Sequence, residues 1–151
     1  MSFKEFLKAM RIIHLALAAG IAVYIIITIF LVYSGGMGFK EEGFTEMFMI
    51  VIPIFVLSAL VASVVVVKRK LEALNKNYDS FEEKVAEYRS ILIIKYALIE
   101  GPAFFAIVAY MLTEEDLFII AASIILGYLI LLRPSKSTIA KDLNMRETDL
   151  D

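Results

Sequence analysis

The chain has 151 residues, of which 60% are hydrophobic and 21% charged, and its formal net charge is -2. It has no cysteine and one histidine, which excludes disulfides and the usual zinc and haem ligand sets. Ordinary globular domains are roughly 45–50% apolar, so the composition indicates a membrane protein.

The apolar residues gather in four runs, at 12–33, 47–67, 91–112 and 117–132. About 20 apolar residues at 1.5 Å per residue cross a hydrocarbon core of roughly 30 Å. Three runs reach that length, whereas the fourth needs a thinner bilayer, snorkelling flanks or shelter from its neighbours. We therefore predict an all-α, polytopic membrane protein with four transmembrane helices.

An amphipathic segment precedes the first run. Ser2 and Glu5 have the spacing of a capping box, and Phe3, Phe6 and Met10 fall on one helical face. This segment is expected to lie in the membrane interface. The first run is too long for a cleavable signal peptide and lacks a small-residue cleavage site at its far end.

The largest polar connection, residues 68–90, follows the second run. Ser80 and Glu83 form a possible capping box there, after a turn at 75–77. We predict a helical hairpin whose two arms pack along an apolar stripe, with a partner-binding surface as the alternative. The stripe has the helical spacing of three and four residues and consists of Leu71, Leu74, Tyr78, Phe81, Val85 and Tyr88.

The third and fourth runs are joined by a very short turn, residues 113–116, so their helices must be antiparallel neighbours. Pro134 is expected to end the fourth helix. In the tail, residues 134–151, Ser137 is expected to cap a weak helix. The last six residues are expected to be disordered.

Basic residues divide the connections into two kinds. Outside the apolar runs, all Lys and Arg except Lys40 precede the first run, lie in 68–90 or follow the fourth run. The other two connections carry six acidic residues: Glu41, Glu42, Glu46, Glu114, Glu115 and Asp116. The positive-inside rule predicts a multi-pass protein of the cell inner (plasma) membrane, with both termini and the 68–90 hairpin cytoplasmic. Anionic lipid is the expected partner of this basic cytoplasmic rim, and nucleic acid is not expected.

The chain also contains an internal similarity. Residues 12–22 align without gaps on residues 93–103, with six of eleven positions identical. We predict two tandem hairpins related by a parallel repeat, as in some transporters. Ala19 is aligned with Glu100, so only the second half carries a carboxylate.

Glu100 lies inside the third run, nine residues from its cytoplasmic edge and therefore about 14 Å deep. The same count places Ser58 and Ser123 at that depth on the second and fourth helices. Ionisable residues inside a membrane are costly and are by default functional candidates. Glu100, Ser58 and Ser123 are therefore the candidates for proton, ion or polar contacts.

Gly101 and Pro102 follow the carboxylate directly. Because proline removes a helical hydrogen bond, a kink is expected there, and it serves either a binding site or packing alone. His14 and Lys95 occupy equivalent, shallow positions in the two repeats. Lys95 is expected to snorkel to the interface, and His14 is expected to be interfacial or hydrogen-bonded rather than a proton relay.

Segments in the second half of the chain resemble two known protein families. Leu98–Ala109 resembles the ion-carrying helix of rotary ATPase proteolipid subunits, although here the acid lies on the first helix of its hairpin. Ala97–Phe105 and Leu131–Leu143 resemble segments of small four-helix inner-membrane proteins of the Bacteroidetes. The second resemblance implies a four-helix topology over nearly the whole chain and implies no activity.

The predicted function is that of an accessory or structural subunit of a larger membrane complex, in which Glu100 mediates helix or subunit contacts. The alternative is a small proton- or cation-coupled transporter that acts as a homo-oligomer through Glu100. Little of the chain lies outside the membrane, so we expect no enzyme activity, metal or cofactor. The expected partners are the lipid bilayer and another membrane subunit or a second copy.

Overall fold

The computed structural model describes residues 2–35, 42–78 and 80–150. Helices make up 89% of the structure, and these ranges contain no strands. Three helices are long and apolar enough to cross a membrane, and a fourth span is possible if α4 and α5, bent by 82°, count as one. The elements are α1 Phe3–Tyr33, α2 Glu42–Asn77, α3 Phe81–Thr113, α4 Asp116–Leu131, α5 Lys136–Asp142 and the short 3-10 helix η1 Glu147–Leu150.

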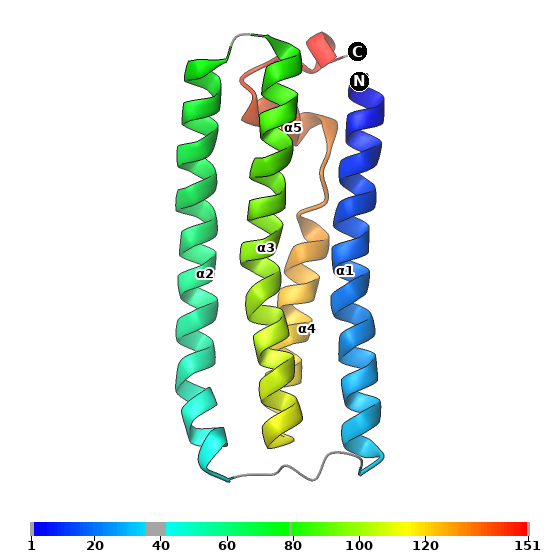
Figure 1. Ribbon diagram of the computed structural model, residues 1–151, viewed down its shortest axis with the longest axis vertical. Helices are drawn as coiled ribbons and strands as arrows, with labels where there is room; N and C mark the ends of the chain where they lie inside the picture. Colours follow the sequence, from blue (N-terminus) through cyan, green and yellow to red (C-terminus); the bar gives the residue numbers. More distant parts are fainter. Residues whose placement is uncertain (1, 36–41, 79, 151) are drawn as a thin grey trace.

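Helix α3 is the centre of the bundle. It packs against α1, α2 and α4, and α1 and α2 lie on its two sides with α4 behind it (Figure 1). In the most apolar 18-residue stretch of α3, 44% of the residues are buried, whereas the corresponding shares are 22% in α1 and 17% in α2. As predicted, α3 and α4 are antiparallel neighbours. In the described ranges α1 and α2 make few contacts with each other, so two tandem hairpins remain a prediction.

Both termini and the α2–α3 turn lie at the same end of the bundle (Figure 1). The α3–α4 turn, the end of α1 and the start of α2 lie at the opposite end. The first end carries most of the Lys and Arg residues and is called the basic end below. This arrangement agrees with both termini being on one side of a membrane, and the side itself remains a prediction.

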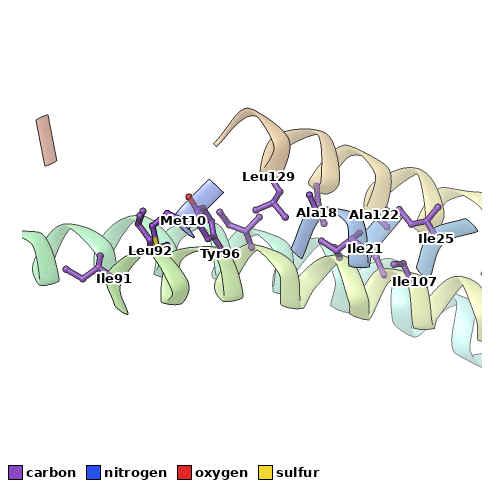
Figure 2. Packing of buried hydrophobic residues seen from close by; sticks show 14 of the residues in the cluster. Met10, Ala18, Ile21, Ile25, Ile91, Leu92, Tyr96, Ile107, Ala122 and Leu129 are labelled. Carbon is purple, nitrogen blue, oxygen red and sulfur yellow. The ribbon is translucent and has the colours of Figure 1, made fainter. Parts of the chain in front are cut away.

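Small residues bring α1 and α4 together over α3. Ala18 and Ile21 of α1 lie against Ala122 and Leu129 of α4 (Figure 2), and all four are buried. Alanine allows helix backbones to approach closely, which strengthens dispersion contacts where lipid provides no hydrophobic driving force. The α1–α4 contact therefore rests on packing.

The apolar side chains at the start of α1 pack inside the protein and do not form a lipid-facing surface, and the position of this segment relative to the membrane remains a prediction. Phe3, Phe6 and Met10 are buried, and the Phe6 ring centroid lies 6.4 Å from that of Tyr88 in α3. The α2–α3 hairpin offers these side chains an apolar surface, and burial there is favourable by about 25 cal/mol per Å². In the stripe, Leu74, Val85 and Tyr88 are buried in the same cluster, which favours packing within the chain over partner binding.

The tail also differs from expectation. Ser135, and not Ser137, is the N-cap of α5, and its hydroxyl accepts a hydrogen bond from the Thr138 amide at 3.2 Å. Within the expected disordered end, residues 147–150 form η1, because Leu150 is buried in the core with Leu143 of the tail, whereas Asp151 lies outside the described residues.

Two hydrogen bonds fasten α5 to the hairpin. The Tyr88 hydroxyl donates to Asp142 Oδ2 at 2.6 Å, and Asn75 Nδ2 donates to the Asp142 carbonyl at 2.9 Å. Burial, together with the hydrogen bond to Asp142, raises the pKa of Tyr88. Tyr88 therefore remains a donor throughout the neutral pH range.

The end of α4 is satisfied by side chains of α1. Helix α4 has 16 residues, about 24 Å at 1.5 Å per residue. His14 Nε2 lies 2.7 Å from the Leu129 carbonyl, and Arg11 Nε donates to the Pro134 carbonyl at 3.2 Å. Since a carbonyl can only accept, Nε2 of His14 carries the proton. Non-helical backbone at membrane depth requires such partners, so neighbouring helices shelter the short fourth helix.

Tyr96 of α3 completes this arrangement. Its hydroxyl donates to the Leu132 carbonyl at 3.5 Å, and its ring meets the His14 ring edge-on with centroids 5.1 Å apart. His14 is only 5% exposed. It is therefore a buried residue, hydrogen-bonded between three helices, and its depth in the membrane remains a prediction.

We expect His14→Phe to lower the free energy of unfolding by about 1 kcal/mol, because the Leu129 carbonyl loses a buried donor. Unfolding of the purified protein in detergent micelles measures this. The control is Ser123→Ala, whose hydroxyl bonds only to the Ile119 carbonyl of its own helix and whose loss should cost under about 0.5 kcal/mol. Equal stability of the two variants would contradict a stabilising role for His14.

Candidate functional site

Glu100 lies at the margin of the α1–α3 contact. It stands four residues after Tyr96 and four before Phe104, so all three fall on one side of α3. Tyr96 meets His14 of α1, and Phe104 meets Tyr24 of α1 with ring centroids 5.5 Å apart. Glu100 is half-buried, and its helical register places it between these two contacts with α1.

No group of the described chain pairs with the Glu100 carboxyl by a hydrogen bond or ion pair. Helix α1 cannot supply one at this level, because residues 15–23 between His14 and Tyr24 are all apolar. A polar group in hydrocarbon without a partner costs about several kcal/mol. Glu100 therefore differs from His14, whose donor is satisfied within the bundle.

Ser58 lies on α2, exposed, and does not hydrogen-bond to Glu100 in the described structure. It borders a shallow cavity of ≈ 290 Å³ between α2 and α3 together with Ala62, Ala97 and Gly101. Ala97 and Gly101 flank Glu100 in sequence and are both exposed. We call the surface formed by Ser58, Ala62, Ala97 and Gly101, which lies next to Glu100 on α3, the small-residue face.

Ser123 is not part of this face. It is exposed on α4, and its hydroxyl donates at 2.8 Å to the Ile119 carbonyl one turn earlier. The predicted cluster of one carboxyl and two hydroxyls is therefore not joined by hydrogen bonds. Equal depth in three helices did not bring the three side chains to one place, because depth leaves the helical face undetermined.

Helix α3 continues without a break through Gly101 and Pro102, so the expected kink does not interrupt it. Pro102 is buried and lines cavities on the α2 side of α3. A side chain built at Gly101 would meet nothing within 4 Å. Pro102 thus serves packing, whereas the space beside Gly101 is open.

Lys95 is on a different side of α3 from Glu100. It is half-buried and lines a large cavity at the basic end, between α2 and the tail. Five helical residues place two side chains about 140° apart, and the two residues face different surroundings accordingly. An ion pair between them does not occur.

The polar contacts of the tail and of the α4 end were not predicted. Arg11 and Tyr96 bond to carbonyls 123 and 36 residues away in the chain, and Asn75 bonds to Asp142 67 residues away. The only signal was the placement of polar side chains on otherwise apolar helical faces, which does not reveal a partner. The described residues contain no group of three or more His, Cys, Asp or Glu side chains suited to hold a metal ion.

No protein-family model matches the sequence, and searches of curated proteins and of solved structures find no significant match.

We expect Glu100→Gln to change the free energy of unfolding of the isolated chain by less than about 0.5 kcal/mol, because no partner within the chain is lost. Unfolding in neutral detergent measures this, with His14→Phe as a destabilised reference. A loss as large as that of His14→Phe would instead make Glu100 an internal contact between helices.

Proposed function

We propose that the protein is an accessory subunit of a membrane complex and that it docks through the small-residue face onto a transmembrane helix of another protein. The observation that carries this proposal is the Glu100 carboxyl, which lies in an apolar helix with no partner in the described chain. Ionisable groups in membrane helices pair with one another or with other polar groups. A second membrane protein can supply the missing group.

The shape of the face supports docking by a helix. Ala97 and Gly101 are four residues apart on α3, and both are exposed and small on the side of Glu100 that faces away from Tyr96. Across the shallow cavity, Ser58 and Ala62 repeat the same small-xxx-small spacing on α2. Such surfaces allow a neighbouring helix backbone to approach closely, so that interhelical hydrogen bonds can form.

The carboxyl determines the chemistry of the partner. An ionised carboxylate only accepts hydrogen bonds, and a protonated one also donates. The fitting partner is a transmembrane helix with a small-residue side and a Lys, Arg, Ser, Thr, Asn or Gln side chain near the membrane midplane. A cationic partner pairs with the ionised form, and an amide or hydroxyl pairs with either form.

We also propose that the protein lies in the inner (plasma) membrane with its basic end in the cytoplasm. Support comes from the partition of Lys and Arg, since short loops rich in these residues stay in the cytoplasm. The acidic connections at 34–46 and 113–116 then lie outside. The partner helix meets the face from within the bilayer.

Native mass spectrometry after gentle extraction from the native membrane tests the proposal with three variants. Glu100→Leu removes the carboxyl, and Gly101→Leu blocks the face without meeting any atom of its own chain within 4 Å of the added Cβ. Both are expected to lose a partner that the wild type holds in stoichiometric amount. Gly127→Leu is the matched control, because Gly127 is an equally open glycine on α4, and it should keep the partner.

Two results would contradict docking at this face. One is retention of the partner in both Glu100→Leu and Gly101→Leu. The other is a wild-type protein that is extracted only as a monomer or as a homo-oligomer, and a homo-oligomer would favour the transport alternative.

A further inference from the structure

Two cavities between α2 and α4 form one continuous amphipathic cleft. The first, of ≈ 870 Å³, lies at the basic end between α2, α3, α4 and α5. The second, of ≈ 410 Å³, lies deeper in the bundle between α2, α3 and α4. Val64 of α2 and Tyr128 of α4 line both, so the two spaces meet at these side chains.

The cleft exists because α4 ends early. Helices α2 and α4 both pack on α3 and make few contacts with each other in the described ranges. Beyond Leu131 the chain turns by 82° into α5, which leaves space beside α2. Helix α5 is fastened over this space by the bonds of Tyr88 and Asn75 to Asp142.

The first cavity, at the basic end, is called the upper cavity below, and it is positively charged. Four lysines line it, Lys68, Lys76, Lys95 and Lys141, against two carboxylates, Glu72 and Asp142, so its formal charge is +2. In the described structure none of these lysines forms an ion pair with a carboxylate. Four ammonium groups without such partners are suited to bind a phosphate.

Asn75 adds a free acceptor to the upper cavity. Its Nδ2 donates to the Asp142 carbonyl, which fixes the orientation of the amide. Its Oδ1 is buried and has no hydrogen-bond partner. Since a buried acceptor without a donor costs about 1–3 kcal/mol, this atom indicates a ligand group with a hydroxyl or another donor beside the phosphate.

The second, deeper cavity is called the lower cavity below. It is apolar and is lined by residues of the kind that contact acyl chains. Its walls include Leu60, Leu98, Ile124 and Ile125. Along α2 the part of the cleft below the headgroup region, from Lys68 to Val56, is about 18 Å long at 1.5 Å per residue, which is a little more than half of a hydrocarbon core of roughly 30 Å. Val64 and Ile124 are strongly exposed, so the crevice opens sideways to the bilayer.

We propose that this cleft binds one anionic phospholipid with a hydroxylated headgroup, taken from the leaflet at the basic end. The phosphate lies among Lys68, Lys95 and Lys141, and a headgroup hydroxyl donates to Asn75 Oδ1. One acyl chain fills the crevice below Tyr128. Basic pockets between transmembrane helices bind lipid headgroups in this manner. Glu100 lines neither cavity, and the proposal does not depend on docking at that residue.

Lipid binding to the whole protein in neutral detergent tests the site, with native mass spectrometry as the readout. The probes are phosphatidylglycerol, phosphatidylcholine and glycerol phosphate, which lacks acyl chains. We expect one phosphatidylglycerol to be bound per chain, about tenfold more tightly than phosphatidylcholine, which corresponds to about 1.4 kcal/mol. Binding of glycerol phosphate as tight as that of phosphatidylglycerol would overturn the acyl-chain part of the proposal and leave an anion site.

Two pairs of variants separate the cleft from the general charge of the rim. Lys95→Gln should weaken phosphatidylglycerol binding about tenfold, whereas Arg69→Gln, an exposed position on α2 outside the cleft, should leave it unchanged. Ile124→Trp should fill the crevice and weaken binding without a change of charge. Ile120→Trp, one turn earlier on the exposed side of α4, is its control.

Equal loss in Lys95→Gln and Arg69→Gln, with no difference between the two Trp variants, would overturn the proposal in favour of diffuse attraction to the basic rim. The unfolding free energy of each variant is measured alongside. A variant that has lost its fold is replaced by Lys141→Gln, which changes the same cavity from the exposed surface of α5.

Discussion

The carbonyls at the end of α4 and just beyond it link three helices of the bundle. Helix α4 has 16 residues, and the Leu129 carbonyl in its last turn accepts hydrogen bonds both from the Leu132 amide and from His14. Arg11 and His14 reach these carbonyls from α1, and Tyr96 reaches them from α3. The three donors hold α1, α3 and α4 in one register, which explains why a single histidine in an apolar helix is buried at this point.

The early end of α4 also shapes the basic end. The chain returns as α5, whose apolar residues join the first turns of α1 and the α2–α3 hairpin in one core. Segments from the start, the middle and the end of the sequence thus stabilise one another outside the apolar spans. The space left between α2 and this tail is the lysine-lined cavity, so one short helix accounts both for the compact end and for the cleft beside it.

His14 and Glu100 show two outcomes for a polar residue in an apolar helix. The imidazole of His14 is satisfied by a backbone carbonyl of the neighbouring helix, and its role is structural. The half-buried carboxyl of Glu100 lies next to the small residues Ala97 and Gly101 of α3, and no group of the described chain pairs with it. In a bilayer that difference matters. When a membrane helix has a polar group without a partner, its association with a second helix that supplies the partner is favourable.

The sequence by itself determined the helical class, the apolar runs and the turn between α3 and α4, because these depend on composition and on contacts between near neighbours. Capping at Ser2 and at Ser80 was predictable for the same reason. Only the tertiary structure decided which helical faces meet. It separated Ser123 from Glu100 and buried His14 and the first turn of α1. It also directed the Lys95 side chain toward the cavity at the basic end. Each of these outcomes depends on how one helix is rotated about its axis relative to another. Apolar residues on all sides of the membrane helices leave that rotation unmarked in the sequence, and packing against distant segments determines it.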